Sequence, residues 1–406
     1  MRVLIFMCLL AAPLQAELHT YSYPDAVVPE TTADDGGAPY QVFNIRSERY
    51  AVQVSQDGST QDAYVMHSNR PHPSGNLSLN PHAHWTNFSC SGEITVTVQL
   101  LSGDITSCAV YPERKGVTPR VTGNQAVFAV TMDAESDPLQ LYVRMNADNE
   151  HALFVFIDPL ETDVPDRADI GNVEIIRPGE DIQSVRNKLR SSKPYAVFKE
   201  GVHQWGGGKN TGYEGYQMPI ESGKKIYIPG GAYVIGTFDG HNESNFKIYG
   251  RGVLSACGKD RLPGSESIPY SMLHSSGSGS GQVVEGIVST DAPHFHLTFR
   301  GQVHINNVKM MGWWHQVDGI VTGDHSTVEN CFFKVNDDVM KIYSDHCMHR
   351  NNTIFQQVNG APFQFCWGRQ NGDDNVMQDT YIVGCVYTGG TGGTGNNAVI
   401  NARNGS

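Results

Sequence analysis

Three aspartates in the second half of the chain could do chemistry together. Asp318 lies nineteen residues before the pair Asp337 and Asp338. Hydrolysis of a glycosidic bond needs one protonated carboxyl for the leaving oxygen and one ionised carboxylate that activates water or attacks carbon. Three clustered carboxyls can supply both. We expect their mutual repulsion to raise at least one pKa, so that one carboxyl stays protonated near neutrality.

A coiled parallel sheet would bring these acids together. If each coil takes roughly 20 to 25 residues, side chains one coil apart stack at the strand spacing of about 4.8 Å. Short β-branched segments recur from Lys225 onward, and Asn307, Asn330 and Asn352 follow at intervals of 23 and 22 residues. Turn asparagines at this spacing predict a stacked ladder in a parallel β-helix. A second sandwich with chance asparagines is the alternative.

Strand alternation raises a question about the adjacent acids. Neighbours on a strand face opposite sides, so Met340 facing inward and Lys341 facing outward would put Asp337 outside and Asp338 inside. For both acids to take part, the backbone must bend near Asn336 or Asp338, at a strand end or a bulge. The alternative is that Asp338 only sets the pKa of Asp337.

The first half of the chain has a different pattern. Five segments alternate apolar and polar residues between turn residues, which predicts an antiparallel sandwich. These segments are 40–54, 94–101, 126–132, 139–145 and 152–157.

A connector and a short helix separate the two halves. Two prolines and three acids over 158–165 mark the connector, and the pattern over 181–193 predicts a helix that could cap the open end of a coiled sheet. We therefore expect an all-β protein, with an antiparallel β-sandwich over 17–165 and a parallel β-helix over 166–406. No capping segment follows the last predicted strand, so either the sequence is incomplete or something else covers that end.

Composition narrows the classes of partner. The 406 residues suffice for two domains, and 17% charged residues with 43 glycines favour turn-rich β structure. A net charge of −13 argues against nucleic acid and anionic membranes, and an uncharged polymer fits better. Residues 1–16 have the basic start, apolar stretch and small last residue of a secretory signal, too short to span a membrane. We expect a secreted, extracellular protein.

Cysteine and histidine spacing bears on disulfides and metals. Cys90 and Cys108 flank an alternating segment and a turn, so we expect a disulfide between them in an oxidising compartment. The remaining cysteines and the histidine-rich stretch near 60–90 lack the regular spacing of a metal site. We expect no metal and no cofactor.

Several segments resemble one family. The stretches 312–319 and 335–343, with their Asp-Gly and Asn-Asp-Asp motifs, resemble the catalytic region of glycoside hydrolase family 49, which contains dextranases and isopullulanase. The stretch 362–368 resembles the family's Gln and Trp segment on the next coil, and 156–162 resembles the end of its N-terminal sandwich. The resemblance covers most of the chain beyond the signal.

The resemblance implies a fold and a reaction. The fold is an N-terminal β-sandwich followed by a right-handed parallel β-helix, and the reaction is hydrolysis of an α-glucan with inversion at the anomeric carbon. Carried over residue by residue, Asp337 is the general acid, and Asp318 and Asp338 position and deprotonate water. Family members usually continue through more coils at the C-terminus, which puts distal substrate contacts in doubt.

Six residues near the acids are candidates for substrate binding. Aromatic faces can pack on pyranose rings, and polar side chains can hydrogen-bond hydroxyls, although aromatics are also common in any core and a lone histidine is often structural. The candidates are Trp314, His315, Lys341, Tyr343, Gln364 and Trp367.

We expect a secreted monomer that hydrolyses dextran. Three other functions are alternatives. The family resemblance also allows α-1,4 cleavage of pullulan. A polygalacturonase-like pectin hydrolase would want a Gly-His-Gly and an Arg-x-Lys after the acids, and neither is present. An inactive carbohydrate-binding β-helix is the non-enzyme alternative, against which the retention of all three acids argues.

Overall fold

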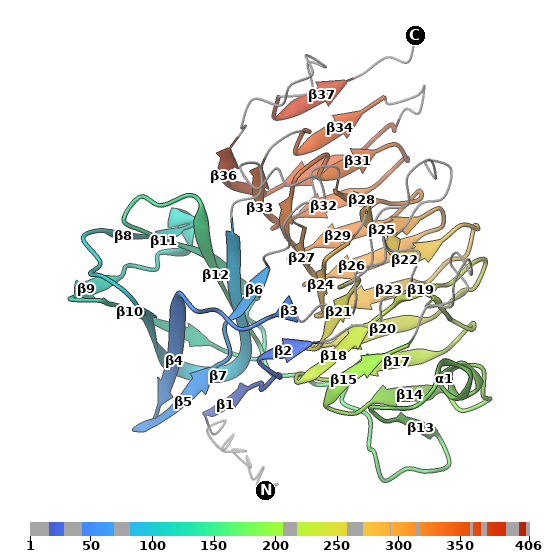
Figure 1. The fold of residues 1–406 in the computed structure, drawn as a ribbon. Coiled ribbons are helices and arrows are strands. Elements are labelled where there is room, and N and C mark those ends of the chain that lie inside the picture. The colour runs from blue at the N-terminus through green and yellow to red at the C-terminus, as the bar shows by residue number, and fades with distance from the viewer. Residues whose placement is uncertain are drawn as a thin grey trace, which may run out of the picture.

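The chain forms two β-structures that lie side by side. The computed structural model describes residues 16–27, 43–68, 82–205, 217–257, 271–292, 294–312, 317–357, 360–366, 372–386 and 398–402. Figure 1 shows an N-terminal sandwich, in blue to green, beside a stack of coils that runs from green to red. The predicted all-β class, a sandwich followed by a parallel β-helix, is confirmed.

One long strand organises the sandwich. The first part of β7 pairs with β1, β6 and β12, and its second part pairs with β4 and β10, so this strand passes from one layer into the other. All pairings in the sandwich are antiparallel except β7 with β12. The strands are β1 Glu17–Thr20, β2 Ala26–Val27, β3 Phe43–Asn44, β4 Tyr50–Gln56, β5 Ser59–Ala63, β6 Met66–Ser68, β7 His82–Leu100, β8 Cys108–Tyr111, β9 Arg120–Thr122, β10 Gln125–Met132, β11 Leu139–Met145 and β12 His151–Asp158, with a short 3-10 helix Glu113–Lys115.

The expected disulfide in the sandwich is wrong. Cys90 and Cys108 are both free. Two strands, β12 and β11, lie between β7 and β8 in the sheet, and the register puts Cys108 level with the start of β7, whereas Cys90 lies near the middle of β7. A disulfide needs Cα atoms about 4.4 to 6.8 Å apart. The sequence spacing had suggested a simple hairpin, whereas the intervening strands belong to other parts of the chain.

Three parallel sheets build the β-helix, and each is named here by its first strand. The β13 sheet contains β13 Val173–Ile176, β14 Tyr195–Phe198, β17 Lys225–Ile228, β20 Lys247–Gly250, β23 Gln282–Glu285, β26 Val303–Asn306, β29 Thr327–Glu329, β32 Met348–Arg350 and β35 Val376–Gln378. The β15 sheet contains β15 Gly201–Gln204, β18 Ala232–Ile235, β21 Val253–Ser255, β24 Val288–Thr290, β27 Lys309–Met311, β30 Phe332–Val335, β33 Thr353–Gln357 and β36 Tyr381–Val386. The β16 sheet contains β16 Gln217–Pro219, β19 Thr237–Asp239, β22 Ser271–Ser275, β25 Phe295–Phe299, β28 Asp318–Val321, β31 Met340–Ile342, β34 Phe363–Phe365 and β37 Ile400–Ala402.

Alternating side chains fill the interior of these coils. Apolar residues from all three sheets form one continuous buried cluster. Burying each such side chain contributes about 1.5 to 3 kcal/mol, so the stack of coils is held mainly by this core. The helix predicted over 181–193 is present as α1, Ile182–Leu189, and it packs on the first coil through Val185 and Leu189.

An asparagine ladder is present, but it is shifted from the predicted one. Asn330 Nδ2 donates to Asn306 Oδ1 over 2.9 Å, and Asn351 Nδ2 donates to Asn330 Oδ1 over 2.6 Å. Of the predicted members only Asn330 belongs to the ladder, because the side chains of Asn307 and Asn352 bond elsewhere. Coils of slightly unequal length explain the error, since a fixed sequence interval drifts off the turn.

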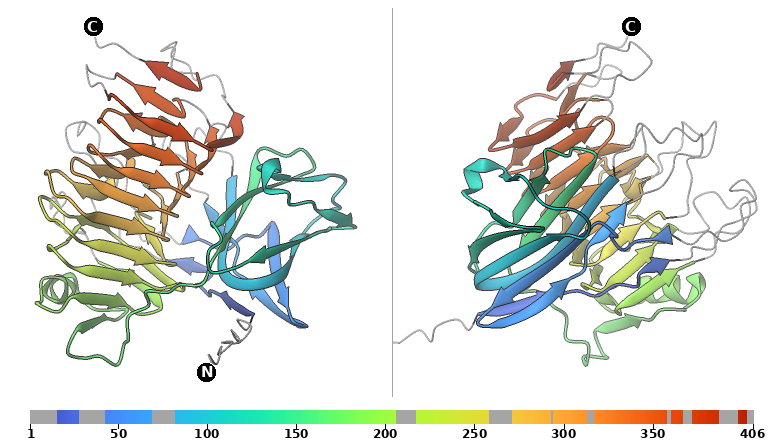
Figure 2. Two further views of the ribbon diagram at one scale, coloured as in Figure 1. Left: turned by 180° about the vertical axis from the view of Figure 1, so that it is seen from behind. Right: turned by 60° about the vertical axis from the view of Figure 1, so that its left-hand side comes forward.

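The sandwich packs against the outer face of the β15 sheet. Figure 2 shows the two parts in contact from behind and from the side. A buried ionic cluster lies at this contact: Lys309 Nζ is 2.7 Å and Arg251 Nε is 3.2 Å from Asp158 Oδ2, and Asn307 donates to Asp158 Oδ1. The last sandwich strand ends at Asp158 and β13 begins at Val173. The exact boundary at 165 stays a prediction.

Helices that could span a membrane are absent from the described ranges. None of the helices there has the length and apolar character to cross a bilayer. The segment 1–15 of the expected signal lies outside the described residues.

Candidate active site

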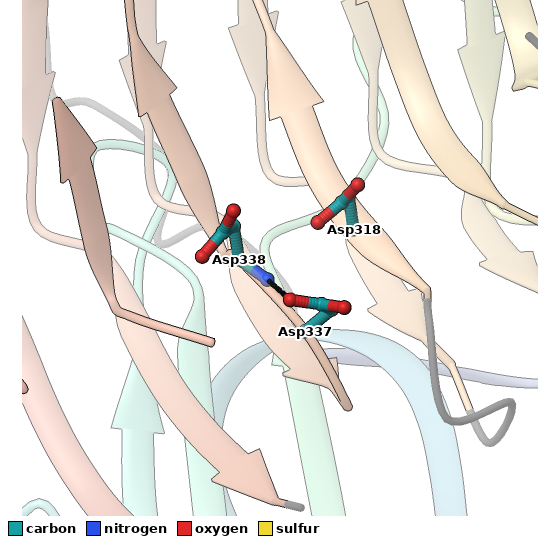
Figure 3. Close-up of side chains that lie close together, drawn as sticks. All are labelled: Asp318, Asp337 and Asp338. Carbon is teal, nitrogen blue, oxygen red and sulfur yellow. Dashed lines mark hydrogen bonds between the residues drawn. The ribbon is translucent and has the colours of Figure 1, made fainter. Parts of the chain in front are cut away.

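The three aspartates of the sequence analysis lie together on the β16 sheet. One oxygen from each of Asp318, Asp337 and Asp338 lies within 4.8 Å of the others. Figure 3 shows Asp318 at the start of one strand and the other two just before the next strand. Asp318 and Asp338 are buried, with 6% and 2% exposed, while Asp337 is half-buried. The three carboxyls that the sequence interval predicted to be neighbours are thus neighbours in the structure.

A bend between β30 and β31 answers the question about alternation. Neither acid of the pair lies on a strand, because residues 336–339 form a turn between the two. The backbone N–H of Asp337 donates to Val317 O over 3.0 Å, and the N–H of Gly319 donates to Asp338 O over 2.8 Å. These two bonds fix the turn on the segment that carries Asp318. The bend expected near Asn336 or Asp338 is therefore present.

Asp318 is held in a strongly perturbed environment. Its Oδ1 lies 3.4 Å from Lys341 Nζ, and its Oδ2 lies 3.9 Å from His294 Nε2. Burial raises the pKa of Asp318 well above its usual range, and the charges of Asp337 and Asp338 raise it further, while Lys341 acts in the opposite direction. The acid cluster therefore retains a proton to higher pH than isolated aspartates would.

Lys341 supplies the positive charge of the cluster. Its Nζ donates to Asp338 Oδ2 over 2.5 Å. Burial would lower the pKa of Lys341, but Asp318 and Asp338 outweigh that effect and raise the pKa above its ordinary value. Three carboxylates at this spacing could also hold a cation. The Lys341 ammonium already lies against two of these carboxylates, those of Asp318 and Asp338. That the site requires no metal stays a prediction.

The next coil supports the turn that carries Asp337 and Asp338. The backbone N–H of Ala361 donates to Asp338 Oδ1 over 3.1 Å, and the buried Gln356 Nε2 donates to Asp337 O over 3.1 Å. Gly360 packs directly on this backbone, and a Cβ there would lie 2.2 Å from the carbonyl carbon of Asp337. Its φ of +86° is also one that glycine adopts most easily.

The structure describes only some of the six residues that were predicted to bind substrate. Trp314, His315 and Trp367 lie outside the described residues. Tyr343 is half-buried near the cluster, and burial raises the pKa of its hydroxyl. Gln364 is the register neighbour of Lys341 on the next coil, but it is fully buried and its Nε2 donates to Phe365 O. A substrate role for these side chains stays a prediction.

Two neighbours of the acids were missed from the sequence. Phe295 is the register partner of Asp318 on the preceding coil, and its ring lies 5.7 Å from Lys341 Nζ. His294 packs on Phe295 with ring centroids 4.4 Å apart and approaches Asp318. The interval of 23 residues between Phe295 and Asp318, one coil length, was the signal that could have found them.

Comparison with known proteins finds relatives that match most of the chain. A dextranase from Arthrobacter globiformis is 24% identical over 92% of this chain and 72% of its own length. The isopullulanase from Aspergillus niger is 21% identical over 75% of this chain and 57% of its own length. The resemblance of the chain to glycoside hydrolase family 49 is confirmed. The predicted class of enzyme, a glycoside hydrolase, is thereby confirmed.

A solved structure supports the same assignment at the level of the fold. Dex49A from Penicillium minioluteum superposes with a TM-score of 0.73 at 18% identity, over 95% of this chain and 82% of that chain. This likeness shows that the two chains share the same fold. No protein-family model matches the sequence.

Proposed function

We propose that this chain acts as a family 49 enzyme, that it is a secreted endo-hydrolase of an α-glucan, that it cleaves α-1,6 bonds of dextran, and that it inverts the anomeric centre. The observation that carries the proposal is the cluster of three carboxyls within 4.8 Å, with one buried lysine among them. Its relatives support the substrate class, since the dextranase of Arthrobacter globiformis matches over most of this chain.

The charges of the cluster support a division of roles. In our proposal Asp337, the least buried of the three, is the general acid that protonates the leaving oxygen. Asp338 is held by Lys341 and the N–H of Ala361, and it positions the attacking water together with Asp318. The proton that the cluster retains through burial and mutual repulsion has to be on Asp337 when substrate is bound.

The distance between the catalytic carboxyls bears on whether the reaction inverts or retains the anomeric configuration. Inverting enzymes usually separate acid and base by about 6.5 to 9.5 Å, and retaining enzymes by about 5 to 5.5 Å. The nearest oxygens here are within 4.8 Å of one another, so inversion rests on the family and not on this distance. A first-released product with retained configuration would overturn the assigned roles.

A second substrate is favoured by one relative. Isopullulanase of Aspergillus niger matches 75% of this chain, so α-1,4 cleavage of pullulan is the alternative proposal. Secretion remains part of the proposal and rests on the signal-like residues 1–16, and the monomeric state stays a prediction.

Reducing-end release by the purified chain tests the function. Dextran, pullulan and polygalacturonate are compared side by side, with and without EDTA. We expect release from dextran that Asp337→Asn lowers by about 100- to 10,000-fold, the usual contribution of a general acid. Release from pullulan alone would select the α-1,4 alternative, release from polygalacturonate alone would indicate a pectin hydrolase, and binding without release would indicate an inactive binder.

A further inference from the structure

Polar side chains continue from the acid cluster along the outer face of the β16 sheet. Asp239 on β19 is the register partner of His274 on β22, and His274 is the partner of Thr298 on β25. Thr298 is in turn beside Val321 on β28, the strand that begins at Asp318. We call Asp239, His274 and Thr298 the polar row. All three are half-buried.

Hydrogen bonds within the polar row set its side chains in fixed positions. Thr298 Oγ1 shares a bond of 2.7 Å with His274 Nδ1 and another of 2.7 Å with Ser271 Oγ. Burial lowers the pKa of His274, which outweighs the opposite effect of Asp239, so the imidazole is neutral near neutrality. A neutral imidazole can both donate and accept, as a sugar hydroxyl does. The bond through Nδ1 leaves Nε2 as the ring atom for a ligand.

The spacing of the row suits a chain of sugars. Strands lie about 4.8 Å apart, so Thr298, His274 and Asp239 are about one, two and three strand spacings, up to about 14 Å, from the strand of Asp318. One strand spacing is close to the length of one hexose unit. Phe295, half-buried and in register with Asp318, adds an aromatic ring beside the acids, on the same strand as Thr298.

The other two outer faces of the β-helix are occupied by contacts within the protein. The sandwich covers the β15 sheet through a shared apolar cluster. On the β13 sheet, Lys247 pairs with Asp163 of the connector, and Tyr227 donates to Glu161 of the same segment. The polar row makes no contact of this kind with the sandwich or the connector among the residues described.

We infer that the polar row, with Phe295, binds the α-glucan on the side of the acids toward the N-terminal coils, each coil holding about one sugar unit. This inference rests on the proposed function. Asp239 and His274 would hydrogen-bond hydroxyls of units two or three positions from the cleaved bond. The ligand class is an uncharged, hydroxyl-rich polymer, because the row contains one carboxylate and no cationic side chain to hold an acidic sugar.

Substrate length is the variable that tests this inference. We compare kcat/KM for isomalto-oligosaccharides of increasing length, and malto-oligosaccharides if pullulan is the substrate, in wild type, His274→Ala and Thr298→Val. Thr327→Val is the matched control, since Thr327 is also half-buried on a strand but lies on the β13 sheet. We expect both row variants to lose about three- to tenfold on long substrates, the effect of one hydrogen bond, and less than about twofold on the shortest.

A uniform loss at all lengths, or equality with Thr327→Val throughout, would overturn the inference. The melting temperature of each variant is compared with that of wild type to check that the fold is intact. If the enzyme hydrolyses glucan but the loss of kcat/KM in the row variants does not depend on substrate length, the inference is wrong and the proposed function is unaffected.

Binding separates the two ideas if hydrolysis is not found. In gels that contain dextran or pullulan, migration of Asp337→Asn is compared with and without His274→Ala. Retardation that His274→Ala reduces by threefold or more supports the row even without turnover. If Asp337→Asn is retarded in neither gel, the inference about the polar row is overturned. If the wild-type chain releases reducing ends from none of the glucans, the proposed function is overturned separately.

Discussion

At the scale of single residues, Lys341 controls the charge of the acid cluster. It lies against Asp338 and Asp318, two carboxylates that are almost completely buried. Without an ammonium there, each ionised carboxylate would lie in a medium of low dielectric with no opposite charge, which is strongly unfavourable. In the proposed mechanism, Lys341 therefore allows the carboxylate that activates water to stay ionised at a pH at which a second carboxyl keeps its proton.

Replacement of Lys341 by methionine should change the pH profile as well as the rate. Lys341 lowers the pKa of Asp318 against the effect of burial, so its loss raises that pKa further. Because the acidic limb of kcat/KM reports ionisation of the base in the free enzyme, we expect this limb to move to higher pH in Lys341→Met. We also expect kcat/KM at the wild-type optimum to fall on the order of 100-fold.

A matched control for this experiment is Lys225→Met on β17. Lys225 is also a half-buried strand lysine, but it packs over the ring of Tyr195 on the β13 sheet. Its profile should overlay that of wild type. An acidic limb that stays in place in Lys341→Met would exclude Asp318 as the ionising group.

Sequence spacing predicted the acids well and their surroundings poorly. Asp318, Asp337 and Asp338 were found because a fixed interval matched one coil. His294 and Phe295 were missed because their approach to Asp318 depends on strand register, which pattern analysis of one segment does not supply.

At the scale of elements, the turn over 336–339 depends on the coil that follows it. Gly360 has a φ of +86°, and a Cβ there would lie 2.2 Å from the carbonyl carbon of Asp337 and 2.4 Å from the nitrogen of Asp338. Backbone atoms cannot move aside as a flexible side chain can. A side chain at 360 must therefore displace the turn that carries both acids.

We expect Gly360→Ala to lower kcat more than about tenfold, since small misplacement of catalytic groups is costly. Gly103→Ala is the control, because Gly103 has a similar φ of +83° but nothing within 4 Å of a Cβ. Both variants carry about 1 to 2 kcal/mol of left-handed strain, and only Gly360→Ala has the clash. Equal loss of activity in the two variants, measured on the proposed substrate, would contradict this account.

Elements with strong periodicity were predicted from sequence, and elements defined by partners were not. Alternation gave β10, β11 and β12 nearly residue by residue, and the pattern over 181–193 gave α1. The sharing of β7 between both layers was not foreseen, because each half of that strand alternates in the same way and only its partners differ. The same limitation led to the wrong disulfide.

At the scale of the whole molecule, a buried ionic cluster ties the sandwich to the β-helix. Asp158 has no exposed surface and accepts hydrogen bonds from Lys309 and Asn307, and Arg251 lies 3.2 Å from it. Burial lowers the pKa of Lys309 to about 8 even though Asp158 opposes that effect. The sequence did not predict this cluster, since the partners of Asp158 lie 93, 149 and 151 residues further along the chain.

Loss of the Asp158 carboxylate should weaken the contact between the two parts. Asp158→Asn removes the anion that lies against two buried cations, and we expect it to destabilise the protein by about 3 to 5 kcal/mol. The control is Asp163→Asn, which removes a pair with Lys247 in which the carboxylate is 46% exposed and should cost less than about 1 kcal/mol. Thermal and urea unfolding, followed by circular dichroism and tryptophan fluorescence, compare the two variants. If they unfold at the same urea concentration, the cluster does not hold the sandwich on the β-helix, and the shared apolar cluster must do so alone.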